Sequence, residues 1–464
     1  MTSVTLAVVG GGVSGLAAAW EGMRRGADVV VLEASDRAGG VLATSPLGDF
    51  AVDEAADAFL ARVPEAVELC CELGLGDELV APATGSAYVW SGDALRRLPA
   101  EQLLGVPTDL EAVGASGILS PAGLARAQDD LTRPDDRPDG DEAVGALVRR
   151  RLGDEVLDRL VAPLVGGIWA GDCDRLSLRT ATPQLAAARD RGPSLLRAAA
   201  EARSEAVAAA AAAGDRPVFL APRGGMGRLV SALTEALGSR VRYGAPVTRL
   251  SRAGARWRLE PAGVTADAVV LAVPAHRAAP VLADHAPGAA ATLAGIDHAT
   301  VALVGLVVDR DAVGRQLDGS GFLVPRSAGR LITACSWVSS KWAHLAGDGS
   351  SVVLRASAGH AGDGRAAALD DDALVAGVLA DLRDVMDLRG APTAVRVSRW
   401  PLSFPQPRPG HLDAVDAVDA ELAARTPRLA ATGAWARGVG IPACIRTARA
   451  AAGRVLTAVT GPPG

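Results

Sequence analysis

Lysine is almost absent from this chain: of its 47 basic residues, Lys341 is the one lysine and the other 46 are arginines. Together with abundant alanine, this usage is typical of mutational bias in a GC-rich genome rather than of a function. Acidic residues number 53, so the formal net charge is −6 and the isoelectric point is about 5.6. An acidic balance of this kind argues against nucleic-acid binding and against membrane attachment through basic residues.

Cysteine and histidine are also scarce. The five cysteines and six histidines show no spacing typical of metal ligands, and the odd number of cysteines suits a reducing compartment. We therefore expect no metal site. No Ser/His/Asp, Cys/His or paired-carboxylate arrangement stands out, so the sequence identifies no catalytic acid or base.

Long apolar runs are missing as well. The N-terminus has no basic segment before its apolar stretch, and glycines interrupt that stretch. No window holds the ~18 strongly apolar residues that a membrane-spanning helix needs. We expect a cytoplasmic protein without a transmembrane segment, while its oligomeric state and any loose contact with a membrane stay open.

The most informative feature that is present lies at residues 4–33. An apolar run of strand length enters a Gly-x-Gly-x-x-Gly turn, a helical pattern follows, and a second apolar strand ends at Glu33. Such an arrangement binds the pyrophosphate of a dinucleotide at the helix N-terminus, while the acidic residue accepts hydrogen bonds from a ribose. The turn comprises Gly10, Gly11, Gly12, Val13, Ser14 and Gly15. The alternative is a purely structural turn in which Glu33 ends a strand.

The residues after Glu33 narrow the choice of nucleotide. Arg37 can meet a pyrophosphate, and Gly39 and Gly40 allow the backbone to pass close to a bulky cofactor. Flavoproteins that bind a whole FAD often carry this extension, whereas nicotinamide-binding domains rarely need it. The sequence therefore favours FAD, and it offers no second Gly-x-Gly-x-x-Gly for a nicotinamide donor. An exposed turn that happens to carry an arginine is the alternative.

The chain alternates between α/β and helical character. Residues 85–215 are expected to be largely helical, interrupted by the acidic, proline-containing segment 129–142, for which we predict a solvated loop that needs no partner. Residues 300–358 alternate like antiparallel strands and precede a helix near 371–386. The tail, 427–460, predicts a strand, a glycine loop and a long helix.

A second glycine-rich segment precedes the last helix. Residues 438–442, Gly-Val-Gly-Ile-Pro, place a proline at the start of that helix and bring backbone N–H groups over its end. A helix N-terminus stabilises the negative charge that a reduced flavin carries near N1 and the C2 carbonyl. Alone, the segment is as well explained by a loop–helix junction. Paired with the N-terminal fingerprint, it predicts the site of the flavin ring.

Over nearly its whole length the chain resembles the oxygen-dependent porphyrinogen oxidases of the Gram-positive type. The segments that carry the resemblance are residues 4–40, 151–179, 222–226 (Pro-Arg-Gly-Gly-Met), Pro405-Gln406 with Gly410-His411, and 438–446. The first is shared with amine oxidases and phytoene desaturases. The block at 151–179, which contains Gly-Gly-Ile-Trp-Ala-Gly-Asp, is much more specific.

The resemblance implies an α/β fold with α+β insertions. It consists of a Rossmann-like FAD-binding domain of the p-cresol-methylhydroxylase/amine-oxidase superfamily, a helical domain and a substrate-binding sheet domain. We assign residues 1–84, 216–295 and 396–464 to the FAD-binding domain, 85–215 to the helical domain and 296–395 to the sheet domain. Carried over by motif, the FAD contacts are Gly10 to Gly15, Glu33, Ala34, Arg37, Gly39, Gly40, Val41, Ala55, Ala56, Asp57, Ala58, Val247, Trp400, Val439, Gly440 and Ile441.

One departure from the family pattern concerns residues 55–58. The family usually has a glycine-bearing turn there, whereas this chain has Ala55, Ala56, Asp57 and Ala58. An alanine does not adopt a positive φ cheaply, so the backbone near the flavin must be ordinary or differ locally.

The resemblance also implies an activity, the oxidation of a porphyrinogen to a porphyrin in haem biosynthesis. O2 is then the electron acceptor and hydrogen peroxide a product, and each of three two-electron oxidations removes a hydride from a methylene carbon together with a proton; in the overall balance two of the three protons leave pyrrole nitrogens and the third leaves the fourth methylene carbon. The substrate is coproporphyrinogen III or protoporphyrinogen IX, and the Gram-positive resemblance favours the former. Arg96, Arg97 and Lys341 could bind propionates, although a solvated surface role explains each of them better.

Two alternatives to this function stay open. A flavin amine oxidase shares the fingerprint and the architecture, but it normally places aromatic side chains around the amine, and aromatic residues make up 3% of this chain. The other alternative is a catalytically silent protein that binds FAD and tetrapyrroles, which the alanines at 55–58 keep open.

Overall fold

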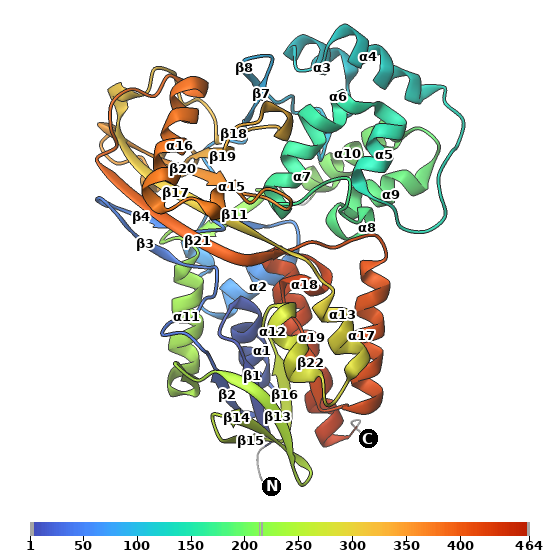
Figure 1. Cartoon of the computed structure of the whole chain (residues 1–464), viewed down its shortest axis with the longest axis vertical. Coiled ribbons are helices and arrows are strands. Elements are labelled where there is room, and N and C mark those ends of the chain that lie inside the picture. The colour runs from blue at the N-terminus through green and yellow to red at the C-terminus, as the bar shows by residue number, and fades with distance from the viewer. Residues whose placement is uncertain (1–3, 213, 215–216, 462–464) are drawn as a thin grey trace.

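The structure is a computed structural model, and it describes residues 4–212, 214 and 217–461. Its elements form three lobes: a lower lobe built on a parallel sheet, an upper lobe built on a mixed sheet, and an upper lobe of helices (Figure 1). Segments far apart in the chain, coloured blue, yellow and red, lie side by side in the lower lobe.

A five-stranded parallel sheet organises the lower lobe, with the strand order β12-β2-β1-β16-β22. Its strands are β12 (Val241–Arg242), β2 (Asp28–Leu32), β1 (Thr5–Val9), β16 (Ala268–Leu271) and β22 (Leu429–Ala431). The central strands are buried on both faces, which explains their continuous apolar sequences. Because the strands are parallel, their carboxyl ends share one edge, and this edge faces the upper lobes (Figure 1).

Helices and a small sheet cover the two faces of the parallel sheet. Leu6 and Val8 share one core with α1 (Val13–Arg24), α11 (Gly227–Leu237) and α19 (Ile441–Thr460). Ala7 and Val9 share the other core with a small antiparallel sheet and three helices. These elements are β13 (Val247–Ala253), β14 (Arg256–Pro261), β15 (Val264–Ala266), α12 (Ala275–Leu282), α13 (Pro287–Ala294) and α17 (His411–Arg425).

The mixed sheet has the strand order β21-β17-β20-β19-β18-β7-β8. Its strands are β21 (Ala394–Pro405), β17 (His298–Asp309), β20 (Ser351–Ala358), β19 (Ile332–Trp337), β18 (Gly321–Leu323), β7 (Tyr88–Ser91) and β8 (Ala94–Arg97). Val304 and Leu306 share a core with α16 (Asp371–Met386), so this helix covers one face. On the other face Val307 and Val353 join the core of the lower lobe. Residues 88–97 and 396–405, assigned from the sequence to the helical and FAD-binding domains respectively, pair within this sheet.

The helical lobe has its own core and lies beside the mixed sheet (Figure 1). Its helices are α3 (Leu110–Ser116), α4 (Pro121–Gln128), α5 (Val144–Leu152), α6 (Asp154–Val156), α7 (Ala162–Trp169), α8 (Leu178–Ala181), α9 (Pro183–Arg191) and α10 (Leu195–Ala212). The remaining short elements are β3 (Thr44–Leu47), β4 (Phe50–Asp53), β5 (Phe59–Leu60), α2 (Pro64–Glu72), β6 (Leu79–Val80), β9 (Gln102–Leu103), β10 (Val106–Pro107), β11 (Phe219–Pro222), α14 (Val338–Lys341), α15 (Arg365–Ala368) and α18 (Ala434–Arg437).

The acidic segment 129–142 is a solvated loop, as predicted, at residues 134–140, which are exposed, but not at its two ends, where Asp130 and Glu142 are buried. Asp130 is fully buried, and its carboxylate accepts hydrogen bonds from Arg151 Nε at 2.5 Å, from Ser194 Oγ at 2.8 Å and from Leu196 N at 2.8 Å. Glu142 is also buried and forms ion pairs with arginines of α5 and α9. The high charge density of the segment led us to expect that these carboxylates are exposed. Their ion-pair partners lie on α5 and α9, outside the segment, so the segment alone does not reveal them.

Within the ranges that the structure describes, no helix combines the length and the apolar character needed to span a bilayer.

Candidate functional site

The Gly-x-Gly-x-x-Gly turn joins β1 to α1 at the carboxyl edge of the parallel sheet. Gly10 has a φ of +101° and donates its N–H to Leu32 O at 2.9 Å. A Cβ at Gly15 would lie 1.8 Å from Gly10 O, so the helix approaches the turn as closely as only glycine permits. A Cβ at Gly12 would meet no atom within 4 Å, so the space in front of the α1 N-terminus is open. An open helix end of this kind suits a pyrophosphate.

Glu33 follows β2 at the same edge. Its carboxylate accepts hydrogen bonds from Gly11 N at 2.6 Å, Ser35 N at 2.8 Å and Ser35 Oγ at 2.7 Å. A carboxylate has about four acceptor positions, so it can still accept a ribose hydroxyl. Ala245 N donates to Glu33 O at 2.8 Å, which brings the start of β13, and with it Val247, to the same end of the candidate site. Ala34 is exposed beside Glu33.

The glycine pair that follows lies directly against the fingerprint. Gly39, with a φ of +102°, donates its N–H to Gly11 O at 2.8 Å. Gly40, with a φ of +59°, lies so close to Gly12 that a Cβ on it would be 3.4 Å from Gly12 Cα. The two glycine loops therefore form one surface, with the exposed Val41 at its end.

Arg37 stabilises this loop from within. Its guanidinium donates to the carbonyl oxygens of Ala38 at 3.2 Å and Gly40 at 2.8 Å. The guanidinium carbon also lies 5.9 Å from the centroid of the Trp400 ring, so the N-terminal loop and β21 meet here. Contact of Arg37 with a pyrophosphate stays a prediction.

The N-termini of α1 and α19 lie close together. The two helices pack against each other, and burial raises the pKa of the Cys444 thiol, in the first turn of α19, to about 11 although a hydrogen bond with Ser14 of α1 opposes this rise. Neither helix has an acidic residue in its first turn or a side-chain cap, so the positive ends of both dipoles stay available to an anion. Val439, Gly440 and Ile441 form the entrance to α19.

Residues 54–58 connect the fingerprint region to the mixed sheet. Trp400 Nε1 donates to Glu54 O at 2.9 Å, and the Glu54 carboxylate accepts Ser45 Oγ at 2.6 Å and Ser398 Oγ at 3.0 Å. None of residues 55–58 has a positive φ. The alanines of this segment thus adopt an ordinary backbone, which is one of the two outcomes that the sequence left open.

Asp57 is the centre of a charge cluster. Both oxygens of its carboxylate accept hydrogen bonds from Lys341 Nζ at 2.9 Å, and one oxygen lies 3.2 Å from Arg355 NH2. The three side chains are 14%, 20% and 10% exposed, respectively. Burial alone would raise the pKa of Asp57, but the charges of Lys341 and Arg355 outweigh it and hold this pKa well below its usual range. A solvated surface role for Lys341, which the sequence analysis preferred, is therefore wrong.

Arg96 and Arg97, the two arginines suggested as propionate ligands, both contact groups close to them in the fold. Arg97 is 56% exposed and lies 3.4 Å from Asp318, whereas Arg96 is half-buried and donates to Ser91 O at 3.1 Å.

Asp53 lies next to this cluster and is buried. Its carboxylate accepts hydrogen bonds from Thr44 Oγ1 and from Met226 N, and a Cβ on Gly225 would lie 2.8 Å from it. This close packing, with a φ of +83° at Gly225, explains the second glycine of the Pro-Arg-Gly-Gly-Met motif. Burial raises the pKa of Asp53 to about 6, although the hydrogen bond from Thr44 and the charge of Arg355 oppose the rise.

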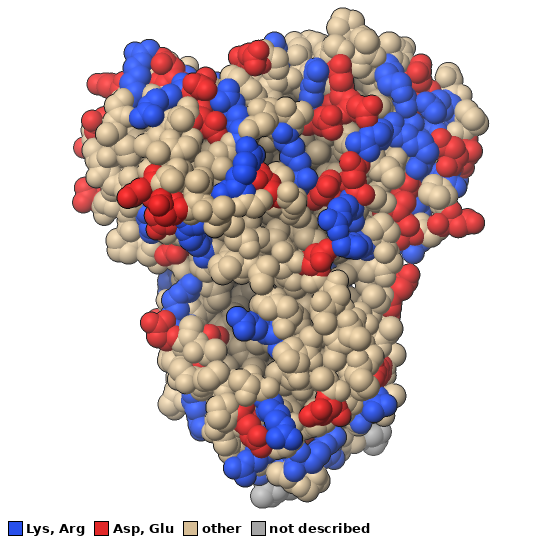
Figure 2. Space-filling model, in the orientation of Figure 1, with Lys and Arg blue, Asp and Glu red and all other residues tan. Residues whose placement is uncertain are grey.

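The inner face of the mixed sheet is only partly covered. Leu303, Thr333 and Ser357 on this face are half-buried. A Cβ on Gly167 of α7 would lie 3.5 Å from Leu323 of β18, while the next residue, Ile168, is 48% exposed. The face drawn in Figure 2 is hollowed near its centre, below β21 in the orientation of Figure 1, and mostly uncharged atoms line the hollow.

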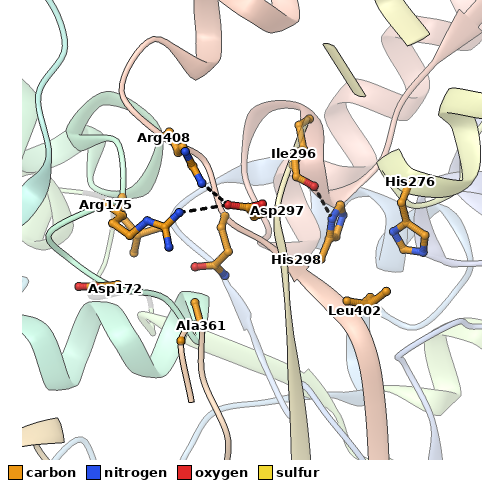
Figure 3. A pocket seen from close by; sticks show the side chains of 12 residues that line it. Asp172, Arg175, His276, Ile296, Asp297, His298, Ala361, Leu402 and Arg408 are labelled. Atoms are coloured by element: carbon orange, nitrogen blue, oxygen red, sulfur yellow. Dashed lines mark hydrogen bonds and ion pairs between the residues drawn. The ribbon is translucent and has the colours of Figure 1, made fainter. Parts of the chain in front are cut away.

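A separate pocket of about 580 Å³ opens where the three lobes meet (Figure 3). Asp297, which precedes β17, pairs with Arg408 and lies 3.3 Å from Arg175. The rings of His276 and His298 meet edge to face with centroids 4.9 Å apart, and burial lowers the pKa of both histidines. The acidic and basic side chains that line this pocket balance one another, so its charge favours no ionic ligand.

The residues around the fingerprint fit a flavin nucleotide. They offer an open helix end, an acidic residue with spare acceptor positions and a second uncapped helix end, all at one edge of the sheet. Across the described ranges, no group of three or more His, Cys, Asp or Glu residues is arranged to hold a metal ion. The structure brings the predicted residues at positions 10–15, 33–41, 55–58, 400 and 439–441 to this edge or to the sheet above it. The sequence analysis did not identify Arg355 as part of the site, nor the ion pair between Lys341 and Asp57. That Lys341 is the one lysine of the chain was a signal that could have drawn attention to it.

The fold and this site define a flavoprotein oxidoreductase with a Rossmann-like nucleotide-binding lobe. Residues 13–456 match the family model described as "Flavin containing amine oxidoreductase", and the chain belongs to this family. It is 37% identical to the coproporphyrinogen III oxidase of Mycobacterium leprae over 99% of both chains, and 35% identical to that of Bacillus subtilis over 97% of both. The crystal structure of a candidate protoporphyrinogen oxidase from Exiguobacterium sp. 255-15 superposes with a TM-score of 0.85 at 31% identity, over 98% of both chains. The expected α/β fold and family are confirmed.

Proposed function

We propose that this chain is an FAD-dependent oxidase that converts coproporphyrinogen III to coproporphyrin III in haem biosynthesis. The observation that carries the proposal is the meeting of the two glycine loops, the α1 and α19 N-termini and Trp400 at one open edge. Relatives matched over nearly their whole length and named for this activity support the substrate.

In this proposal FAD lies across the carboxyl edge of the parallel sheet. Gly12 and the α1 N-terminus bind the pyrophosphate, and Glu33 binds the adenosine ribose near Val247. The flavin ring lies near residues 55–58, Trp400 and the α19 N-terminus. Residues 1–84, 216–295 and 396–464 then form the FAD-binding domain, 85–215 the helical domain and 296–395 the sheet domain, with β7, β8 and β21 contributing their pairing to the sheet.

Each of three rounds removes a hydride and a proton from the porphyrinogen, and O2 takes up the two electrons and two protons as hydrogen peroxide. A bound flavin supplies the hydride acceptor. The protein residues position the macrocycle and exclude water. We place the porphyrinogen between the inner face of the mixed sheet, with Leu303 and Leu323, and the end of α7, with the exposed Ile168. No described side chain is assigned as a general base.

An anaerobic reduction experiment tests the proposal. Purified protein is loaded with FAD and mixed with coproporphyrinogen III, protoporphyrinogen IX or a primary amine, and bleaching of the flavin absorbance is followed by stopped flow. We expect rapid bleaching by coproporphyrinogen III, slower bleaching by protoporphyrinogen IX and none by the amine. Re-admission of O2 should restore the absorbance and release hydrogen peroxide.

The same experiment separates the alternatives. Bleaching by the amine alone would indicate an amine oxidase. Bound FAD that no substrate bleaches would indicate a silent flavin-binding protein.

A further inference from the structure

The single lysine of the chain, Lys341, shares one carboxylate with a second cation. Asp57 provides one negative charge for Lys341 and Arg355, so the three side chains carry a net charge of +1. Arg355 is fixed further because its NH1 donates to Asp53 O at 2.9 Å. Trp342 Nε1 lies 3.4 Å from the Asp57 carboxylate and adds a neutral donor.

The charged groups around these three side chains do not change the sign of the net charge, which stays positive. Asp53 and Glu54 add two carboxylates, while Arg396, bound to Ser45 O at 2.8 Å, and Arg37 add two guanidinium groups. The wall where segment 54–58 meets the mixed sheet thus holds four cations and three carboxylates. Asp53, Asp57, Lys341 and Arg355 are at most 20% exposed, so their charges act over a longer range than they would in water, whereas the charge of the exposed Arg37 is screened more strongly.

We infer that Lys341 is a positioning residue that fixes Asp57 against Arg355 and supplies the excess positive charge that eases reduction of the flavin. This inference rests on the proposed function, which places the flavin ring beside residues 55–58. A reduced flavin carries negative charge, so a nearby cation favours it over the oxidised form.

The use of lysine at this one position has a physical reason. The Lys341 ammonium is a compact point charge that contacts both carboxylate oxygens of Asp57 through one atom, whereas a guanidinium group, which can also bind both oxygens, is larger and planar and uses two nitrogens to do so. Arg355 already approaches the carboxylate from the sheet. A second guanidinium would have to share the space between α14 and residues 55–58.

The test compares two substitutions of one ion pair that change the charge in opposite directions. Lys341→Met removes a positive charge and Asp57→Asn removes a negative one. We expect the equilibrium constant for flavin reduction, measured against a reference dye, to fall about tenfold in the first variant and to rise about tenfold in the second. A tenfold change is about 30 mV for a two-electron couple. Lys341→Arg keeps the charge and should restore most of the potential.

A matched control separates charge from stability. Arg330→Met removes a cation with 18% exposure that pairs with Asp381 of α16, on the opposite face of the sheet. It should lower the melting temperature without changing the potential. If Lys341→Met and Asp57→Asn behaved like this control, or shifted the potential in the same direction, the pair would be a structural staple and the inference would be wrong.

The uniqueness of the lysine offers a second readout that does not depend on turnover. Protein labelled with ¹⁵N at lysine alone gives one Nζ resonance, from Lys341. We expect this resonance to shift between flavin-free, oxidised and dithionite-reduced protein, and a resonance that stays fixed in all three states would contradict the inference. Flavin-bound, active enzyme whose variants show unchanged potentials would overturn this inference alone, whereas protein that binds no flavin would overturn the proposed function as well.

Discussion

Single residues at the fingerprint differ sharply in what they tolerate. Packing requires a glycine at position 15, because Gly10 O occupies the space that a Cβ there would need. A Cβ on Gly12, by contrast, would point into open space. The same residue type thus serves the fold at one position and the ligand at another.

Gly15→Ala and Gly12→Ala should therefore fail in different ways. The first forces a Cβ to within 1.8 Å of Gly10 O and should lower the free energy of unfolding of the flavin-free protein by about 1–3 kcal/mol or more. The second has a φ of −70°, which alanine adopts freely, so its stability should be unchanged while FAD affinity falls roughly tenfold. Urea unfolding without flavin and fluorescence titration with FAD measure the two quantities. Equal stabilities of the two variants would contradict the packing role of Gly15.

Asp53 gives a pH dependence whose sign follows from its pKa. The carboxyl has a pKa of about 6 in the folded protein against 3.8 as its ordinary value, because burial disfavours the charge. The folded state holds the extra proton between these values, so the contribution of this group is present below pH 4 and is lost as the pH rises through 6. Its full size is about 3 kcal/mol.

Asp53→Asn should remove this dependence while its amide oxygen still accepts the hydrogen bonds from Thr44 and Met226. The free energy of unfolding of the variant, measured relative to the natural chain, should increase steadily from pH 4 to pH 7. Stability curves that run parallel over this range would show that Asp53 titrates normally.

At the scale of elements, buried charge rather than apolar packing fastens the segment before α5. Asp130 and Arg151 are 0% and 2% exposed, so removal of either partner leaves a charge without compensation in the core of the helical lobe. By contrast, Arg149 on the same helix is 43% exposed and pairs with two exposed aspartates.

Arg151→Met should consequently lower the free energy of unfolding by about 3–5 kcal/mol. The double variant Asp130→Asn/Arg151→Met should recover a large part of this loss, because no unpaired charge remains. Arg149→Met should cost no more than about 1 kcal/mol, as expected for an exposed pair. Chemical denaturation of these three variants, of Asp130→Asn alone and of the natural chain checks the series, and additive effects of the two core substitutions would contradict a direct pairing.

For the whole molecule, sequence patterns predicted those elements that depend on interactions between residues close together in the chain. The fingerprint, the helix at 371–386 and the strand and long helix of residues 427–460 form as expected, since each depends on the periodicity or turn chemistry of neighbouring residues. The contacts of Asp57 with Lys341 and of Asp130 with Ser194 join residues 284 and 64 positions apart, and no short-range pattern encodes them. The same limit explains why β7 and β8, four residues each, were not recognised as strands of the distant sheet.

At the junction of the lobes, three separate segments fix the end of α7 through hydrogen bonds. Gln406 Nε2, after β21, donates to Trp169 O at 2.9 Å, Arg326 NH2, after β18, donates to Gly171 O at 2.7 Å, and Ala361 N donates to Ala170 O at 2.7 Å. Ala170 itself has a φ of +47°, a strained conformation for a residue other than glycine. These bonds fix the end of α7, which carries the exposed Ile168 that we propose to contact the porphyrinogen.

Loosening this junction should affect substrate binding rather than flavin binding. Gln406→Leu leaves Trp169 O without its side-chain donor in a buried position, so the end of α7 should shift and the KM for coproporphyrinogen III should rise roughly tenfold, a loss of about 1.4 kcal/mol. FAD affinity should stay unchanged, because the residues proposed to bind it lie on the lower lobe and on β21 before this point. Asp297→Ala serves as the control at the same junction, since its ion pairs are exposed and worth at most about 1 kcal/mol. Steady-state kinetics and FAD titration of both variants decide the matter: if Gln406→Leu weakened FAD binding as much as it raised KM, the junction would support the whole site and not the porphyrinogen site alone.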